Sequence, residues 1–283
     1  RRSRAVDRLR DVSPDQRGSP RAYSNVEALT LVAQVRVTKR GNRGHRSCTS
    51  NRHMLPLLLA PLGSVGFAYL FCYGGVEGPV DWTMQTESHG SRDRRVVALT
   101  FDDGPDPART PALLDTLRAL EVPATFFVLG NKVDAHPELA ARIAREGHEL
   151  GNHTYSHPYL PLKRSRTVAI ELGATDASIA RATGITPALA RPPYGGRSPR
   201  NVRAMQRAGK RVVLWDVNSF DWKGAPADEV AERVLTRTRP GSIILMHDAR
   251  DGGEITVAAV RLIVPALRAR GFDLVTVSRA LAA

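Results

Sequence analysis

Short apolar runs alternate with helical patterns from residue 94 onward. The clearest runs are VVALTF at residues 96–101, ATFFV at 124–128 and SIILM at 242–246. Their length is typical of strands. Shorter segments of the same kind predict further strands at 148–151, 189–191, 211–216 and 273–275.

Between these runs, apolar residues recur at the three- and four-residue spacing of a helix. In residues 256–270, Val257, Val260, Val264 and Leu267 recur at this spacing, and Gly271 follows the last turn, where helices commonly end. The same spacing predicts helices at 109–120, 137–146, 165–182, 199–208 and 227–236.

About seven strands thus alternate with helices over roughly 190 residues, which indicates a parallel α/β architecture. The pattern fits a (β/α) barrel or a doubly wound sheet. In both, the active site lies at the carboxyl ends of the strands. Polar residues that directly follow a strand are therefore the candidates for chemistry.

The segment before residue 94 divides into three parts. Residues 1–53 are basic, with 13 Lys and Arg against 4 Asp and Glu, and we expect them to be disordered or not translated, because Met54 opens the next part. Residues 54–75 are apolar and uncharged, which predicts a signal peptide or a membrane anchor. We expect residues 76–93 to be a linker. This organisation predicts an extracellular or cell-envelope protein with its folded domain at 94–283.

Charge and cysteine content narrow the class of partner. The chain has a net charge of +13, and its two cysteines, Cys48 and Cys72, precede the expected domain. That placement excludes a zinc-finger or disulfide scaffold for the domain. Its basic residues are scattered through helical segments with no nucleic-acid motif, so we expect no nucleic-acid partner. An anionic envelope polymer or lipid headgroups suit the charge, and we expect a monomer.

Two polar clusters follow the first and third expected strands. TFDDGPD at 100–106 places Asp102 and Asp103 at a strand end, where successive side chains point to opposite sides, so that one can bind a metal and the other hold a proton. In GNHTYSH at 151–157, His153 and His157 converge if the segment forms a helical turn or a tight loop. Two imidazoles and one carboxylate make a metal site with open positions. Taken alone, the first cluster also fits an acidic turn that caps the next helix. The second, taken alone, also fits a pair of surface histidines.

Three further clusters follow later strands. RPPYGG at 191–196 combines backbone-fixing prolines and permissive glycines with Arg191, which can orient a carboxylate. WDVNSFDW at 215–222 supplies aromatic side chains that suit the faces of sugar rings. IILMHD at 243–248 places His247 just past a strand, as a general acid requires. Each cluster alone fits a loop, core packing or a capping histidine, but five together at strand ends indicate an active site.

In this order the five clusters resemble the five motifs of the polysaccharide deacetylases, also called the NodB-homology domain or carbohydrate esterase family 4. The resemblance covers roughly residues 94–280, and TFDDGPD, HTYSH and RPPYG are highly specific together. It implies a deformed (β/α) barrel, similar to a TIM barrel, with about seven parallel strands. It also implies a divalent metal, usually zinc, or another such as Co²⁺.

The resemblance also implies a role for each site residue. The implied metal ligands are Asp103, His153 and His157. The implied catalytic residues are Asp102 as the base, Arg191 as the residue that orients it, His247 as the general acid and Asp221 as the acid that tunes the histidine. The implied substrate-binding residues are Tyr194, through its backbone N–H at the oxyanion, Trp222 as a groove wall and Leu245 in the acetyl-methyl pocket.

One position departs from the family pattern. Asn218 stands where members often have Asp in a D-x-x-D-W stretch, and we expect activity to survive, with an effect on groove shape or histidine tuning. The implied reaction removes N-acetyl groups from an N-acetylglucosamine polysaccharide, either peptidoglycan or a chitin-like polymer. The alternatives are O-deacetylation of acetylated xylan, a metal-dependent amidase acting on a small molecule, and a non-catalytic carbohydrate-binding relative.

Overall fold

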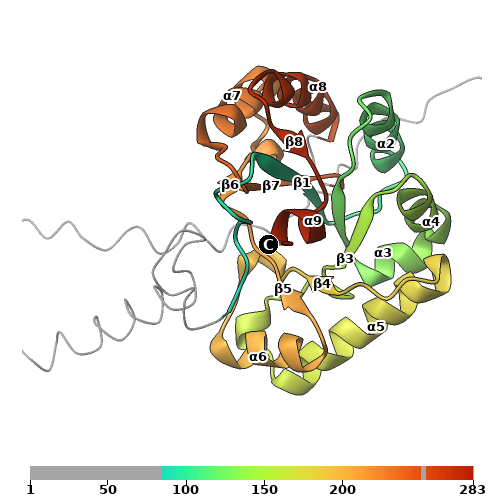
Figure 1. Ribbon diagram of the computed structural model, residues 1–283. Helices are drawn as coiled ribbons and strands as arrows, with labels where there is room; N and C mark the ends of the chain where they lie inside the picture. The colour runs from blue at the N-terminus through green and yellow to red at the C-terminus, as the bar shows by residue number, and fades with distance from the viewer. Residues whose placement is uncertain (1–84, 250–252, 283) are drawn as a thin grey trace, which may run out of the picture. The chain divides into compact units, whose positions relative to one another are not determined.

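A computed structural model of the chain describes residues 85–249 and 253–282 (Figure 1). Seven strands lie in the sheet order β5-β4-β3-β2-β1-β7-β6, and β8 pairs with β1. Every strand pairing is parallel. The strands are β1 (Val96–Asp102), β2 (Thr125–Val128), β3 (Glu149–Asn152), β4 (Leu189–Ala190), β5 (Arg211–Val212), β6 (Val217–Asn218), β7 (Ile243–His247) and β8 (Asp273–Leu274).

Helices connect these strands and cover the sheet. They are α2 (Thr110–Ala119), α3 (Gly130–Ala135), α4 (Pro137–Arg145), α5 (Ser165–Thr183), α6 (Pro199–Arg207), α7 (Ala227–Arg237), α8 (Gly253–Ala269) and α9 (Val277–Leu281), with short 3₁₀ turns η3 (Leu160–Leu162), η4 (Pro193–Gly195) and η5 (Asp221–Lys223). The curled parallel half-barrel confirms the predicted barrel architecture. Parallel strands bring their carboxyl ends to one edge, so the residues that follow them can meet in one site.

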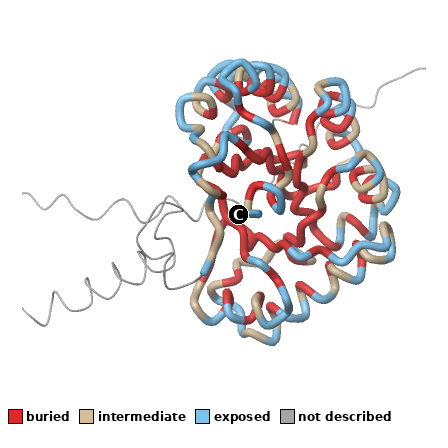
Figure 2. Tube along the Cα trace, viewed as in Figure 1, coloured by how far each residue is buried: buried red, intermediate tan, exposed pale blue. Residues whose placement is uncertain are grey.

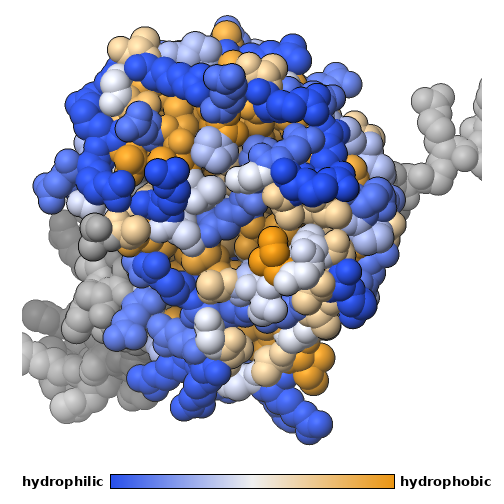
Figure 3. Space-filling view, turned by 45° about the vertical axis from the view of Figure 1, so that its right-hand side comes forward, coloured by the Kyte–Doolittle hydropathy of each residue, from blue (hydrophilic) through white to orange (hydrophobic). Residues whose placement is uncertain are grey.

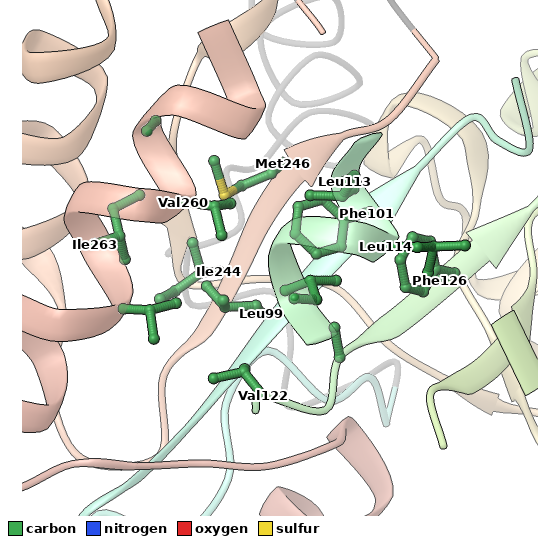
Figure 4. Close-up of a cluster of buried hydrophobic side chains, with 14 of the residues drawn as sticks. Leu99, Phe101, Leu113, Leu114, Val122, Phe126, Ile244, Met246, Val260 and Ile263 are labelled. Carbon is green, nitrogen blue, oxygen red and sulfur yellow. The ribbon is translucent and has the colours of Figure 1, made fainter. Parts of the chain in front are cut away.

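The core lies between β1, β2, β7 and the helices that pack on them. Leu99, Phe101, Phe126 and Ile244 are fully buried there, and the rings of Phe101 and Phe126 lie 5.2 Å apart between centroids (Figures 2 and 4). Burial of one such side chain stabilises the fold by about 1.5–3 kcal/mol. Hydrophilic residues cover much of the outer surface in the view of Figure 3. All residues of β1 are buried, so the strand that carries Asp102 is packed on both faces.

The expected strand at 211–216 is shorter in the structure: β5 covers only Arg211–Val212, and the next strand, β6, begins after the predicted range, at Val217. β5 pairs with β4, whereas β6 pairs with β7, so the two lie at opposite ends of the sheet order. Between them, Asp216 accepts hydrogen bonds from the N–H of Ile243 and the hydroxyl of Ser242, which turns the chain out of a continuous ladder. The predicted start at Arg211 is confirmed, but the predicted end at Asp216 was wrong, because Asp216 makes a partly buried polar contact with the start of β7 instead of continuing the strand.

The N-terminal part of the described chain is attached to the domain. Glu87 forms a bridge with Val213, and His89 forms one with Ser242. Backbone hydrogen bonds of 2.8 and 2.7 Å join Glu87 to Val212 and Leu214. The packed domain therefore extends to the N-terminal side of residue 94, into the segment expected to be a linker.

The other N-terminal predictions lie outside the described residues. These are the basic segment 1–53, the apolar run 54–75 and residues 76–84. Within 85–249 and 253–282, no helix combines the length and the apolar character needed to cross a bilayer. The export prediction stays a prediction.

Candidate active site

A cavity of about 190 Å³ lies at the carboxyl ends of the strands. It brings together residues from all five sequence clusters. Its lining consists of Asp102, Asp103, His153, His157, Tyr194, Trp215, Asn218, Trp222, Leu245 and His247. Eight of the ten residues predicted for the site are in this lining, and the other two, Arg191 and Asp221, lie behind it in contact with Asp102 and His247.

Asp103, His153 and His157 form a compact group of metal-ligand type. Each offers one ligand atom, and these atoms lie within 4.8 Å of one another. The Nε2 atoms of His153 and His157 lie 3.4 and 3.1 Å from Oδ1 of Asp103. Burial raises the pKa of Asp103, but the two imidazoles outweigh it through hydrogen bonds and charge and hold the pKa well below its usual range. This environment favours the ionised form of the carboxylate, which is the form that binds a cation.

The turn after β1 places both neighbouring carboxylates in the same cavity. Asp102 ends the strand, whereas Asp103 has a φ of 77°, in the left-handed region. The expectation that the two side chains point to opposite sides was wrong, because the strand alternation stops where this left-handed residue begins. As a result, Nε2 of His153 lies 3.7 Å from Oδ2 of Asp102 and 3.4 Å from Oδ1 of Asp103.

The two histidines converge through a tight loop rather than a helical turn. β3 ends at Asn152, and Thr154 and His157 have φ values of 71° and 57°. Nδ1 of His153 lies 2.7 Å from the backbone carbonyl of Arg191. A bond of this kind fixes the tautomer and the orientation of a ligating imidazole, so that Nε2 faces Asp103.

Asp102 forms a buried ion pair with Arg191. An Nη1 of Arg191 donates to Oδ1 of Asp102 at 2.7 Å and to the hydroxyl of Thr100 at 2.8 Å. The guanidinium also donates to the Leu214 carbonyl at 2.8 Å and lies 4.0 Å from the centre of the Phe127 ring. Arg191 has no exposed surface. Its bonds leave Asp102 in one orientation beside a permanent positive charge.

Asp221 and His247 form the second buried pair. Nδ1 of His247 lies 2.9 Å from Oδ1 of Asp221, and Oδ2 accepts the backbone N–H of His247 at 2.8 Å. Burial alone lowers the pKa of His247, but the hydrogen bond and charge of Asp221 outweigh it and raise the pKa above its ordinary value. The arrangement favours a protonated imidazole at the cavity wall.

The walls of the cavity are aromatic and apolar. Tyr194 is 55% exposed and Trp222 is 39% exposed, whereas Trp215 and Leu245 are buried. The rings of Tyr194 and His157 are 4.5 Å apart between centroids, edge to face. Exposed rings on a polar cavity suit the apolar faces of sugars, while Leu245 provides a small apolar floor.

Asn218 lines the cavity and also shapes the turn behind it. Its Oδ1 accepts the backbone N–H of Phe220 at 3.0 Å, and Phe220 has a φ of 54°. A carboxylate oxygen can accept the same bond. Asn218 can therefore support the turn that leads to Asp221 in the same way as the aspartate that family members often have at this position.

Several supporting residues were not among those predicted for the site, although Ser219 and Asp248 lie in two of the five sequence clusters. Thr256 and Ser219 donate hydroxyl groups to the two oxygens of Asp221 at 2.7 and 2.9 Å. Asp248 packs beneath Gly104 and accepts the hydroxyl of Thr110 at 2.6 Å. Burial raises the pKa of Asp248 to about 7. For Asp248, the signal in the sequence was its position next to His247, after a strand.

Comparison with known proteins agrees with this geometry. The polysaccharide deacetylase family profile matches residues 89–213. A peptidoglycan-N-acetylglucosamine deacetylase of Bacillus cereus is 40% identical over 189 residues, which are 66% of this chain and 68% of that protein. A chitooligosaccharide deacetylase of Rhizobium leguminosarum bv. trifolii is 39% identical, over 65% of this chain and 91% of that protein.

A solved structure matches the fold as well. It is a peptidoglycan N-acetylglucosamine deacetylase in complex with 4-naphthalen-1-yl-N-oxidanyl-benzamide, with a TM-score of 0.69 and 36% identity. The match covers 72% of this chain and 96% of that one. Together with the relatives above, it confirms the resemblance found in the sequence: the chain belongs to the polysaccharide deacetylase family.

Proposed function

We propose that the protein is a metal-dependent hydrolase that removes N-acetyl groups from an N-acetylglucosamine polysaccharide. The observation that supports this most is the meeting of a metal-ligand group with two buried acid–base pairs in one cavity. A cavity of about 190 Å³ with exposed rings at its walls suits a sugar substituent. The relatives named for deacetylation of peptidoglycan and chitooligosaccharides support the reaction class.

The donor set fits a divalent metal, and zinc suits it best. Asp103, His153 and His157 offer one carboxylate oxygen and two imidazole nitrogens, which leave coordination positions open as catalytic zinc sites do. When bound, such a metal supplies polarisation of a carbonyl oxygen and a lower pKa of water. Co²⁺ is the alternative that suits the same donors.

Two residues of the chain carry out the two proton transfers, Asp102 as the base and His247 as the acid. Asp102, held in place by Arg191, accepts a proton from the attacking water while the new C–O bond forms at the acetyl carbonyl carbon. The backbone N–H of Tyr194 donates to the developing oxyanion. His247, protonated and paired with Asp221, gives its proton to the amide nitrogen as the C–N bond breaks. Acetate and the free amine are the products.

The substrate and location follow from the same reasoning. We infer a carbohydrate polymer of the cell envelope, since relatives act on peptidoglycan and chitooligosaccharides and residues 54–75 fit an export segment. Peptidoglycan and chitin-like polymers share the N-acetylglucosamine unit, which Leu245 would contact through the acetyl methyl group.

The test is acetate release by the full chain after the metal has been stripped. Chitin oligomers, peptidoglycan and acetylxylan are each supplied with and without added zinc. We expect zinc-dependent release from the N-acetylated substrates, and loss of both metal binding and release in His153→Ala. Release from acetylxylan alone would replace the proposal with O-deacetylation. Metal binding with no release from any substrate would contradict a hydrolase function.

A further inference from the structure

The loop between the two candidate metal histidines is fixed at both its backbone and its side chains. His153 donates its N–H to Val128 at 3.0 Å, and Thr154 donates to the side chain of Asn152 at 2.9 Å. The carbonyls of Thr154 and Tyr155 accept N–H groups from the start of α3 at 3.0 and 3.2 Å. Thr154 is buried with a φ of 71°, a conformation that a β-branched residue adopts only when its surroundings enforce it.

One carboxylate from α5 closes the rest of this loop. Oε2 of Glu171 accepts the backbone N–H groups of Tyr155 at 2.9 Å and Ser156 at 2.8 Å. Oε1 accepts the hydroxyl of Ser156 at 2.8 Å. Glu171 thus forms three hydrogen bonds to the two residues that lie midway between His153 and His157.

The position of Glu171 on a long helix makes this contact rigid. α5 has 19 residues and packs on α3, α4 and α6 (Figure 1). Hydrogen bonds to an ionised acceptor are stronger than neutral ones. Through this carboxylate, the packed helix α5 holds the loop in place. Glu171 itself does not line the cavity.

We propose that Glu171 is a positioning residue that shapes the two-histidine loop before a metal binds. This inference rests on the metal site of the proposed function, and it adds a residue outside the family motifs. With the loop formed in advance, binding of the metal requires no further ordering of the two imidazoles. Without Glu171, the strained backbone at Thr154 loses three of the hydrogen bonds that restrain the loop on its C-terminal side.

The first experiment measures metal affinity by competition with a chelator, with zinc as the probe and the full chain as the protein. We expect Glu171→Ala to weaken zinc binding by about 10- to 100-fold, the range found when outer-shell partners of metal ligands are removed. In Glu171→Gln, the side-chain oxygen can still accept the backbone N–H groups of Tyr155 and Ser156. The side-chain NH₂ of the glutamine can donate to the Ser156 hydroxyl. We expect this conservative variant to retain most of the affinity.

A second measurement uses the metal-free protein and does not depend on catalysis. Amide hydrogen exchange at Tyr155 and Ser156 reports whether the loop is formed without metal. We expect both amides to be protected in the wild type and to exchange faster in Glu171→Ala. Glu232→Ala, at an exposed acid on α7, is the matched control and should change neither quantity.

The outcomes separate this inference from the proposed function. Wild-type zinc affinity and exchange in Glu171→Ala would overturn the positioning role, even if the enzyme deacetylates as proposed. Zinc binding that depends on Glu171, with no acetate released, would overturn the deacetylase instead. If Glu171→Ala does not fold, Ser156→Ala removes one of the three bonds at an exposed residue, and about a two- to tenfold loss of affinity is then expected. An unchanged affinity in that variant would count against the proposal.

Discussion

Two buried carboxylates flank the cavity, and their partners differ in kind. Asp102 pairs with Arg191, whose charge is permanent, and Asp221 pairs with His247, whose charge depends on pH. The pairs lie close together, because Asp102 and His247 are partners in the register of β1 and β7. One carboxylate thus has a partner of fixed charge, and the other has a partner that gains and loses a proton.

The difference matches the two tasks that amide hydrolysis requires. A base has to be ionised when substrate arrives, which a neighbouring guanidinium favours. An acid has to hold a proton and then release it, which an imidazole with a raised pKa can do near neutral pH. Substitution of Asp102, Arg191, Asp221 and Asn218 separates these two tasks, with expected effects that decrease in that order.

Asp102→Asn should have the largest effect on activity. The amide has the shape of the carboxylate but cannot accept the proton, so we expect acetate release to fall by about 10²- to 10⁴-fold. Zinc binding should persist, because Asp103, His153 and His157 are unchanged. Near-wild-type turnover in this variant would show that Asp102 is not the base.

Arg191→Lys tests whether the charge or the geometry of the guanidinium matters. Lysine keeps the charge but cannot reach Asp102, Thr100 and the Leu214 carbonyl together. We expect a loss of about 3 kcal/mol or more in the free energy of unfolding, because hydrogen bonds to charged groups contribute ~1.5–3 kcal/mol each. Activity should fall less than in Asp102→Asn. Unchanged denaturant midpoints would mean that the charge alone is sufficient.

Asp221→Asn should change the pH dependence more than the fold. In the wild type, activity requires protonated His247 and falls as pH rises through its raised pKa. Without the negative charge, burial dominates and lowers that pKa, so the basic limb of kcat/KM moves to lower pH. We expect roughly a tenfold loss at neutral pH and a smaller loss under mildly acidic conditions. A basic limb at the wild-type position would exclude His247 as the titrating acid.

The sequence was sufficient to predict the central strand and the residues of the two buried pairs, because they lie in an apolar run and in recognisable motifs. β1 was predicted at 96–101 because its apolar residues are consecutive, and the structure places it at Val96–Asp102. The cluster order led to a family and hence to Asp102, Arg191, Asp221 and His247. Spatial convergence of the clusters followed from parallel strands, which bring distant segments to one edge.

The parts that could not be predicted depend on contacts between segments distant in the chain. Glu171 is an ordinary acid on a helix, and its bonds to Tyr155 and Ser156 appear only once α5 packs beside the loop. α3 and α9 have six and five residues, too few for a helical period. Aspartate adopts the left-handed conformation more readily than most residues, but nothing in the sequence places it at Asp103, and there it overrode the alternation expected for a strand.

Asn218→Asp restores the residue common in the family and should have the smallest effect. A carboxylate oxygen can replace Oδ1 as acceptor of the Phe220 N–H, so the turn to Asp221 should keep its shape. The new negative charge lies in the cavity lining with His247 and should raise the pKa of that imidazole further. We therefore expect a change in kcat/KM of about threefold or less at neutral pH, with the basic limb shifted to higher pH, opposite to Asp221→Asn. A loss of activity together with an unshifted limb would mean that the Asn218 amide makes a contact with substrate that a carboxylate cannot replace.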